Sequence, residues 1–407
     1  MSGTNPRIPS VGNDPREQPG EVAEPREKIW FRSLDEAVIE ADRCIQCGSC
    51  VAACPSDSIG IDEEEGKPTL VRMCTGCSSC WDYCPRSGLR YEAVVERELS
   101  ERALEHPETY AVSAGSEEIR SAGQDGGAVT QLLAELLEVG EIDGAVVARE
   151  DPDRPLRAEP ALATSREELL ESAGSFYTQP MSLGQVDDLV ADAGLEDPDL
   201  ALVGTPCVIE GASALSRYDH EGAEHISLTI ALLCTRSFEY DRLVGRLREF
   251  GVDPAAVEKL DVTEGILFAF DEGGDVLLER AVDDFAAAGL RGCDECADFL
   301  GEAADISAGN VGSAERESTV IVRTDAGKAA WDRVAPELAW TELDDTTALE
   351  KLDTWNSQRA KALLPRSFDP DGSIGINYSE HSDTHEGTDR APEPLNPARV
   401  HQYEEWC

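Results

Sequence analysis

The stretch that decides the fold of the first quarter of the chain is Cys44-Ile-Gln-Cys47-Gly-Ser-Cys50-Val-Ala-Ala-Cys54-Pro55, repeated as Cys74-Thr-Gly-Cys77-Ser-Ser-Cys80-Trp-Asp-Tyr-Cys84-Pro85. Both copies follow the spacing C-x2-C-x2-C-x3-C-P, in which three thiolates bind one [4Fe–4S] cube and the fourth reaches the other cube. We therefore expect one cluster on a first set of thiols and another on a second set. The first set is Cys44, Cys47, Cys50 and Cys84, and the second set is Cys74, Cys77, Cys80 and Cys54.

Zinc sites and redox-active C-x-x-C pairs are the alternatives to this interpretation. Zinc takes four ligands per site, with longer gaps between its cysteine pairs. Two complete copies, each closed by a proline, favour the clusters. Residues 40–92 resemble the bacterial-type two-cluster ferredoxins, and this resemblance implies a protein that moves electrons one at a time.

The charge of the chain is strongly acidic. Its 407 residues carry 82 acidic and 35 basic side chains, for a formal net charge of −47, and six of the basic residues are lysines. Such a charge repels itself at low salt, whereas at molar salt the Debye length falls to about 3 Å. We interpret the acidity as adaptation to a salt-rich, halophilic host. It argues against binding nucleic acid or anionic membrane surfaces, which require basic patches.

Several features indicate a cytoplasmic protein. No apolar run approaches the roughly 20 residues of a transmembrane helix, and the segment 1–27 lacks the apolar core of a secretory signal. Thirteen cysteines, most of them in cluster spacing, fit a reducing compartment better than disulfides. Docking at the periphery of a membrane complex stays open.

The pattern along the chain predicts an α+β protein, in which a two-cluster ferredoxin-like domain precedes a larger mixed α/β domain. We expect a short helix at 33–42, a β-hairpin within 56–73 and a charged helical connector at 93–110. Further on, a helix starts at Ala128 and ends at Gly140, and a second helix covers 240–250. Buried strands are expected at 142–148, 200–204 and 226–234. The domain boundaries follow as a disordered acidic N-terminus at 1–30, a ferredoxin-type domain at 31–95, two regions of the large domain at 105–185 and 186–345, and a flexible tail at 366–407.

Four more cysteines lie in the large domain. Cys207 and Cys234 stand near the ends of expected strands, and Cys293-Asp-Glu-Cys296 is a C-x-x-C loop. Together they supply the four thiolates of a third [4Fe–4S] cluster. The alternatives are zinc and, for Cys207 or Cys234 taken singly, packing as a small apolar side chain. Only Cys407 is then left over.

Several ordered motifs resemble the coenzyme F420 hydrogenase/dehydrogenase beta-subunit family across residues 110–325. They are Ser121–Thr130, Gly140–Val147, Val203–Cys207, Leu233–Phe238, Cys293–Asp298, Ala304–Gly309 and Gly312-Ser313. The resemblance implies that the large domain binds FAD and an iron–sulfur cluster and exchanges hydride with coenzyme F420. With its fused ferredoxin, the chain resembles the electron-input subunits of F420H2 dehydrogenase complexes. Where family members often carry a lysine–glycine pair, this chain has Thr263-Glu264-Gly265.

Elementary chemistry supports a flavin. A deazaflavin releases two electrons as hydride, whereas each cluster accepts one, and a flavin performs both kinds of transfer. No G-x-G-x-x-G lies between a strand and a helix, which disfavours NAD(P)H as the donor. The candidate cofactor-binding residues lie at a helix N-terminus, at a strand end and in the run after the C-x-x-C loop, with ordinary tight turns as the alternative for the glycines. They are Gly126, Gly127 and Thr130, then Gly204, Thr205 and Pro206, then Asp298, Asp305, Ser307 and Gly309. No catalytic residue stands out.

The leading hypothesis is an iron–sulfur flavoprotein that transfers hydride between coenzyme F420 and FAD. Its clusters would pass single electrons to ferredoxin, a partner subunit or a membrane quinone-reducing complex. A second hypothesis is an electron-transfer adaptor subunit of a larger reductase without an F420 site. A third is a related ferredoxin-dependent reductase of another small molecule.

Overall fold

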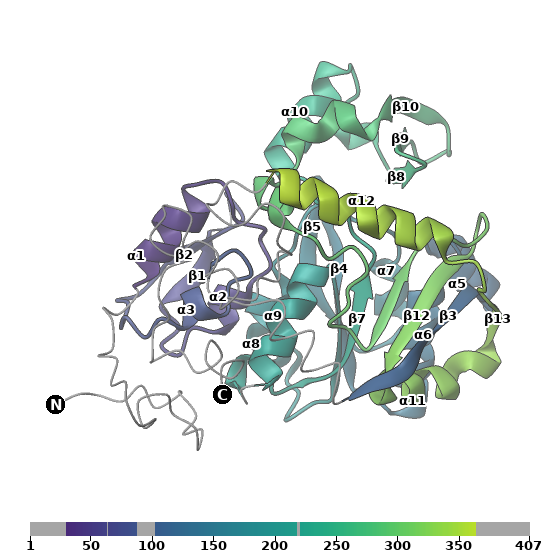
Figure 1. Cartoon of the computed structure of the whole chain (residues 1–407), viewed down its shortest axis with the longest axis horizontal. Helices are drawn as coiled ribbons and strands as arrows, with labels where there is room; N and C mark the ends of the chain where they lie inside the picture. Colours follow the sequence, from purple (N-terminus) through teal and green to yellow (C-terminus); the bar gives the residue numbers. More distant parts are fainter. Residues whose placement is uncertain (1–29, 63, 88–101, 218–219, 364–407) are drawn as a thin grey trace.

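The computed structural model describes residues 30–62, 64–87, 102–217 and 220–363. Figure 1 shows an N-terminal module, residues 30–87, against the side of a large domain that contains the principal sheet. The expected disordered N-terminus and flexible tail lie outside the described residues, apart from Trp30.

The N-terminal module is built around its two cysteine runs. Helix α1 (Phe31–Leu34) continues as a π-helical turn (Asp35–Ile39), close to the helix expected at 33–42. Each cysteine run contains one short helix, α2 (Ser49–Ala52) and α3 (Ser79–Asp82). Strands β1 (Ile59–Asp62) and β2 (Lys67–Leu70) pair antiparallel between the runs, so the expected hairpin is confirmed.

The principal sheet has eight strands in the order β13-β3-β12-β11-β7-β6-β4-β5. The pairs β4·β6, β6·β7 and β7·β11 are parallel, and the other pairs are antiparallel. The strands are β3 (Ala103–Ala114), β4 (Gly144–Asp151), β5 (Arg154–Ala163), β6 (Leu200–Gly204), β7 (Ile226–Leu232), β11 (Ile306–Gly309), β12 (Ser318–Thr324) and β13 (Leu338–Glu342). Mixed α and β structure is therefore confirmed, with the expected strands at β4, β6 and β7.

The expectation of a helical connector at 93–110 is wrong where the structure describes it. Residues 103–114 form strand β3, which pairs with β12 on one side and with β13 on the other. Tyr110, Val112 and Ala114 alternate into the core at the end of this strand. Two partners from distant parts of the chain therefore override the helical character of its charged first half.

Strand alternation divides the core between the two faces of the sheet. Ala145 and Val147 face a core cluster with helices α6 (Ala128–Val139) and α11 (Asp325–Val334). Val146 faces the opposite cluster, which contains helices α8 (Val186–Ala193) and α9 (Pro206–Arg217). That second cluster also contains Ile45 and Tyr83 of the N-terminal module. The module is therefore packed into the same apolar core as the sheet.

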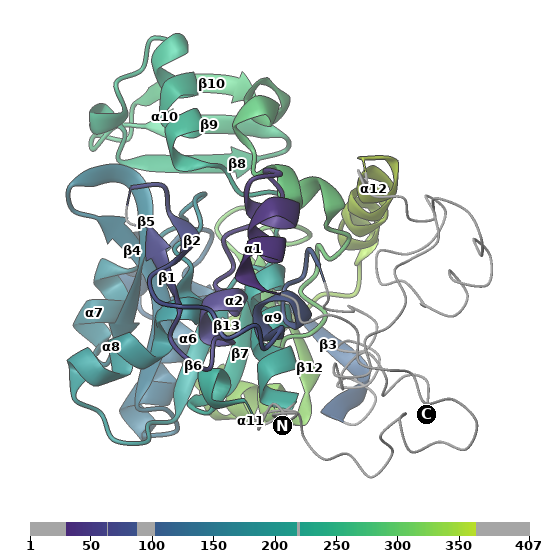
Figure 2. The same cartoon turned by 90° about the vertical axis from the view of Figure 1, so that its left-hand side faces the viewer.

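The remaining elements complete the surface of the large domain. Short helices α5 (Glu117–Ala122) and α7 (Arg166–Glu171) flank α6, and α12 (Thr347–Leu363) crosses the upper part of the domain in Figure 1. Above the sheet, Figure 2 shows a small lobe of α10 (Tyr240–Glu249) and a three-stranded antiparallel sheet. Its strands are β8 (Lys259–Thr263), β9 (Ile266–Phe270) and β10 (Val276–Ala281).

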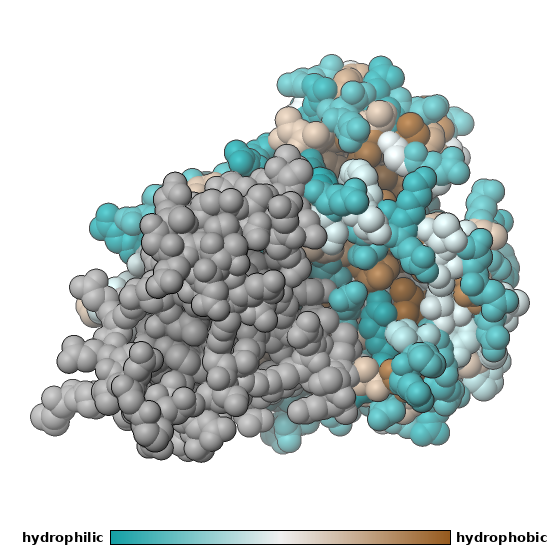
Figure 3. Space-filling model, viewed as in Figure 1, coloured by the Kyte–Doolittle hydropathy of each residue, from teal (hydrophilic) through white to brown (hydrophobic). Residues whose placement is uncertain are grey.

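Polar contacts hold the small lobe to both neighbours. Arg242 on α10 pairs with Asp42 of the N-terminal module at 2.9 Å. The hydroxyl of Tyr177 accepts a hydrogen bond from the Val262 N–H at 3.0 Å. On the face that Figure 3 shows, most of the visible described residues are hydrophilic, with some hydrophobic residues in a hollow between them. No helix within the described ranges combines the length and apolar character that crossing a membrane requires.

Candidate redox site

The two cysteine runs of the N-terminal module form loops of matching geometry. Gln46 and Gly76, at equivalent positions, both have positive φ, and so do Gly48 and Ser78 two residues later. In each loop the first of these two residues, Gln46 or Gly76, directs its N–H toward the Sγ atom of the run's first cysteine. Gln46 N–H donates to Cys44 Sγ at 3.4 Å, and Gly76 N–H donates to Cys74 Sγ at 3.4 Å. Backbone donors of this kind stabilise thiolates.

The thiols of the two runs lie near one another. Burial raises the pKa of Cys50, and the nearby thiolates Cys47, Cys84 and Cys44 raise it further. Burial also raises the pKa of Cys80, which the charges of Cys77, Cys74 and Cys54 increase in turn. The fourth cysteine of each run therefore lies near cysteines of the other run, and the division into two ligand sets stays a prediction.

Thiols buried in this way become thiolates only when a cation lies beside them. Burial raises the pKa of Cys44 to about 12 and that of Cys47 to about 11, so without a metal these groups hold their protons at neutral pH. Coordination deprotonates a thiol outright. Across the described part of the chain, no three Cys, His, Asp or Glu side chains are arranged to share one metal ion. The donor set of eight thiols in two C-x2-C-x2-C-x3-C-P runs fits two iron–sulfur cubes.

The third set of thiols lies where the parallel strands end. Cys207 is in the first turn of α9 after β6, Cys234 follows β7, and Cys293 and Cys296 belong to the 3₁₀ turn Arg291–Glu295 and the residue after it. Burial raises the pKa of Cys234, and the charges of Cys293 and Cys296 raise it further. After burial, the largest contribution to the raised pKa of Cys207 is the charge of Cys47. The four cysteines thus converge, and they do so beside the first set.

Helix α12 supports this third set in a way that the sequence does not signal. Arg359 Nη2 donates to the carbonyl oxygens of Thr235, at 2.8 Å, and Cys293, at 3.1 Å. Asn356 Nδ2 donates to the carbonyl oxygen of Cys296 at 3.2 Å. The helix therefore fixes the loops that carry three of the four thiols.

A cavity of about 170 Å³ opens at the same carboxyl edge of the sheet. Five of the predicted cofactor residues line it, namely Gly127, Thr130, Gly204, Thr205 and Gly309. The N-terminus of α6 also faces it, with Gly127 as N-cap at φ 70° and no described side chain capping the first turn. An uncapped helix N-terminus presents free N–H groups to an anion such as a phosphate. This lining offers N–H donors to an anionic ligand.

The other predicted cofactor residues are not among those that line the cavity. The backbone of Gly126 packs closely against Arg316, and Pro206 opens helix α9. The acidic residues and Ser307 serve internal contacts. Asp298 accepts from the Gly301 N–H at 2.7 Å, Asp305 accepts from the Thr229 and Thr324 hydroxyls, and Ser307 Oγ donates to the Gly301 carbonyl. Burial raises the pKa of Asp298 to about 7.

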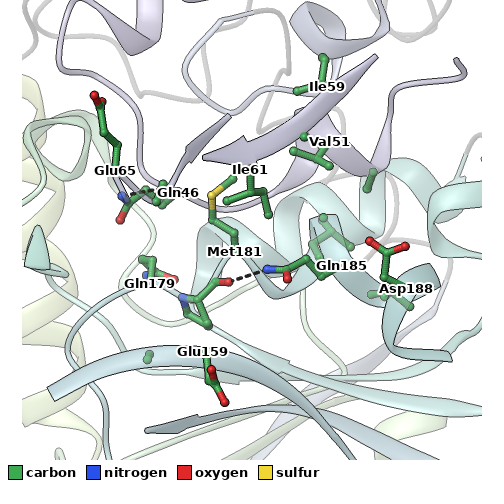
Figure 4. A pocket seen from close by; sticks show the side chains of 18 of the residues that line it. Gln46, Val51, Ile59, Ile61, Glu65, Glu159, Gln179, Met181, Gln185 and Asp188 are labelled. Atoms are coloured by element: carbon green, nitrogen blue, oxygen red, sulfur yellow. Dashed lines mark hydrogen bonds between the residues drawn. The ribbon is translucent and has the colours of Figure 1, made fainter. Parts of the chain in front are cut away.

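A second, wider hollow lies between part of the N-terminal module and the large domain. This cleft measures about 990 Å³, and Figure 4 shows Val51, Ile59 and Ile61 of the module on one side and Gln179 and Met181 on the other. Cys54 of the second set also lines it. Thr178, Gln179 and Pro180 line both the cleft and the cavity, so these residues are a wall common to the two hollows.

Thr205 connects the cavity with the third thiol set. It lines the cavity, and its hydroxyl lies 3.2 Å from Cys207 Sγ in hydrogen-bond contact. Gln179 Nε2 donates to Thr205 Oγ1 at 3.0 Å and to Ser237 Oγ at 2.7 Å. A ligand in the cavity therefore lies one side chain away from the third set.

The segment Thr263-Glu264-Gly265, where family members often carry a lysine–glycine pair, does not line either hollow. Glu264 and Gly265 form the tight turn between β8 and β9 at the exposed edge of the small lobe, both with positive φ. Neither residue lines the cavity or the cleft. Their identity therefore does not bear on the lining of either hollow.

Family models match almost the whole described chain. The beta subunit of coenzyme F420 hydrogenase/dehydrogenase matches at residues 109–186 with its N-terminal part and at 197–346 with its C-terminal part. A 4Fe–4S dicluster domain matches residues 37–89. Both matches coincide with the regions that carry the thiol sets and the cavity.

Individual relatives agree with these models. An uncharacterized protein of Methanocaldococcus jannaschii is 32% identical over 81% of this chain and 98% of its own length. The coenzyme F420-dependent sulfite reductase of the same organism is 30% identical over 80% of this chain, which corresponds to 50% of the relative. An F420H2 dehydrogenase subunit of Methanosarcina mazei is 28% identical over 74% of this chain and 85% of its own.

A solved structure shares the fold. A chain of the F420-reducing [NiFe] hydrogenase complex from Methanosarcina barkeri aligns with a TM-score of 0.59 at 22% identity, over 70% of this chain and 95% of that one. The sequence relatives bear the names of F420-dependent hydrogenase, dehydrogenase and reductase subunits, which makes this chain an F420-related oxidoreductase with an iron–sulfur electron-transfer domain. The chain belongs to the coenzyme F420 hydrogenase/dehydrogenase beta-subunit family and carries a 4Fe–4S dicluster domain ahead of the family's two regions.

Proposed function

We propose that the chain transfers hydride between coenzyme F420 and FAD and passes single electrons through three [4Fe–4S] clusters to a redox partner. The clusters would be held by the first, second and third thiol sets. FAD would be held with its phosphates at the cavity, whose volume of about 170 Å³ admits only part of the dinucleotide, and would supply the step from a hydride to single electrons. The protein's own residues bind, orient and insulate these groups.

The cavity has polar features suited to holding a flavin dinucleotide. The N–H groups of the first turn of α6 would bear the phosphates, since none of the described residues that line the cavity is Lys or Arg. Gly204 and Gly309 end their strands at the cavity, and Val208 and Leu233 fill the space that a Cβ atom would need at these positions. The cleft meets the cavity at Gln179 and Pro180, so a substrate that enters from the cleft would approach the flavin from that side.

The observation that carries the proposal is the contact of Thr205 with Cys207. It joins the cavity directly to the third thiol set. From there the thiols continue in order, because Cys207 lies near Cys47 of the first set and Cys50 of the first set lies near Cys80 of the second. A linear route from cavity to third, first and second cluster is the natural order of transfer.

The second set is the exit of this route. Three of its cysteines, Cys54, Cys74 and Cys77, are partly exposed, whereas three of the first set are buried. We propose that a ferredoxin or partner subunit accepts the electron there, in a salt-rich cytoplasm and with the possibility of docking on a membrane quinone-reducing complex. The names of the relatives support subunit partners, since several of them are hydrogenase or dehydrogenase subunits.

Anaerobic purification followed by flavin, iron and sulfide analysis tests the proposal, together with an F420H2 oxidation assay using an artificial one-electron acceptor. We expect bound FAD, about 12 iron per chain and turnover of F420H2. A protein without flavin would instead be the adaptor subunit. A protein with flavin and clusters but without F420H2 oxidation would be a reductase of another small molecule.

A further inference from the structure

Arg86 lies in the contact between the N-terminal module and the large domain, two residues after Cys84. Its side chain is buried, with 3% of its surface exposed. Nε donates to the Gly292 carbonyl oxygen at 2.7 Å, and Nη1 donates to the Pro85 carbonyl oxygen at 3.0 Å. Pro85 follows a cysteine of the first set, and Gly292 precedes Cys293 of the third set. One guanidinium therefore joins the backbones beside two thiol sets.

The backbone around Arg86 is tightly packed. A Cβ atom on Gly292 would lie 2.1 Å from the carbonyl oxygen of Arg43, the residue before Cys44. Arg43 Nη2 donates to the Arg86 carbonyl oxygen at 2.8 Å. Residues next to Cys44, Cys84 and Cys293 thus meet at one point, and Arg86 is held there by its backbone and by its side chain.

The charge of Arg86 reaches thiols of both sets. Its guanidinium lies near enough to Cys47 of the first set and Cys296 of the third set to interact electrostatically with both sulfurs. Coulombic interactions are stronger in the protein interior than in water. Salt screens a buried charge much less than an exposed one. Arg86 is therefore a fixed cation between two groups that would each carry negative charge.

We propose that Arg86 is a positioning residue shared by two clusters, whose buried guanidinium raises the reduction potentials of the first-set and third-set clusters together. The inference rests on the proposed function for the presence of both clusters. Reduction adds one electron to a cluster, and the donor cluster loses that electron, so the transfer needs no proton or further reactant. A nearby cation stabilises the reduced form of each. Because one charge acts on both, it shifts the two potentials in the same direction and changes the gap between them little.

The test is an anaerobic potentiometric titration of the cluster-loaded protein, followed by electron paramagnetic resonance. Arg86→Gln removes the charge and keeps one hydrogen-bond donor. We expect the reduction equilibria of the first-set and third-set clusters to shift at least tenfold toward the oxidised form, which is about 59 mV for a one-electron couple. The second-set cluster should shift less than tenfold. Arg86→Lys keeps the charge and should hold both potentials within tenfold of the unmodified protein.

Arg72→Gln is the matched control. Arg72 also lies two residues from a predicted ligand, Cys74, but its side chain is 67% exposed and faces Asp57 at 3.6 Å. Solvent and salt screen its charge, so all three potentials should stay unchanged. A comparable shift in Arg72→Gln would mean that any lost positive charge has this effect, and would overturn a specific role for Arg86.

Other outcomes also decide the question. Unchanged potentials in Arg86→Gln, or a shift confined to one cluster, would overturn the shared role. The iron and sulfide content shows whether each variant assembles its clusters. If Arg86→Gln does not assemble them, Arg86→Lys decides: a shift above tenfold at both clusters in that variant contradicts a role for the charge. F420H2 oxidation is measured separately. If both potentials shift in Arg86→Gln but the unmodified protein does not oxidise F420H2, only the proposed function is rejected. If the unmodified protein oxidises F420H2 but the potentials do not shift in Arg86→Gln, only the Arg86 inference is rejected.

Discussion

At the scale of single residues, the structure separates thiols that share a site from side chains that only lie near one. Each thiol set combines cysteines whose charges act on one another, and N–H groups such as those of Gln46 and Gly76 point at the sulfurs. Asp298 and Asp305 are as buried as the thiols, but their carboxylate oxygens accept hydrogen bonds from neighbouring backbone and hydroxyl groups. Chemical type alone therefore does not identify a cofactor residue; the hydrogen-bond partners decide.

Substitution of one cysteine from each set tests the cluster assignment. In Cys47→Ser, Cys77→Ser and Cys207→Ser, we expect the iron content to fall from about 12 to about 8 per chain, because one cube loses a ligand in each variant. The matched control is Cys407→Ser, the one cysteine outside the three sets, which should keep about 12 iron. Retention of all iron in Cys207→Ser would remove the third cluster and leave the other two in place.

At the scale of elements, the N-terminal module is seated on the large domain by close backbone approach. Gly211 on α9 faces Ser49 on α2, and a Cβ atom there would come within 1.9 Å of Ser49 Oγ. Ser49 is buried and its hydroxyl lies 3.2 Å from Cys47 Sγ. The packing of one helix pair therefore also fixes the position of the first thiol set beside the third.

Two helical glycines should respond oppositely to alanine. Gly211→Ala overpacks the α2·α9 contact and should destabilise the protein by about 1–3 kcal/mol. Gly245→Ala is the control: Gly245 lies within α10, and nothing stands within 4 Å of its Cβ position. Because alanine reduces the freedom of the unfolded chain, that change should stabilise by about 0.4–1 kcal/mol. The denaturant midpoints of the two variants show whether each substitution stabilises or destabilises the protein. Equal destabilisation by both substitutions would contradict the close contact.

Some of these elements follow from the sequence and others do not. The cysteine runs are local patterns, so the hairpin between them could be predicted, and the membership of the thiol sets is a prediction that iron analysis tests. Strand β3 could not, because its partners β12 and β13 lie some two hundred residues further along. The hydrogen bonds from Arg359 and Asn356 on α12 could not be predicted either, because only folding brings this helix next to the third set.

At the scale of the whole molecule, the net charge of −47 opposes folding at low ionic strength. Salt also weakens exposed ion pairs such as Arg242–Asp42, but each is worth only about 0–1 kcal/mol. Relief of the overall repulsion should therefore outweigh their loss.

The melting midpoint of the protein should rise as potassium chloride increases from low to molar concentration, because the ions screen the acidic surface. Chloride is chosen over sulfate, since sulfate strengthens apolar burial in any protein. A midpoint that stays flat across this range would contradict adaptation to salt and leave the acidic surface to be explained by a basic partner.

The central claim is that electrons enter at the cavity and pass through the third, first and second clusters in that order. The most direct measurement mixes the anaerobic, fully loaded protein with F420H2, freezes samples at successive times and records the oxidation state of each cluster by electron paramagnetic resonance. We expect reduction to stop short of the first and second clusters in Cys293→Ser, and to reach the third and first but not the second in Cys77→Ser. If the second cluster is instead reduced at the normal rate in Cys293→Ser, electrons bypass the third thiol set, and the route from the cavity is wrong.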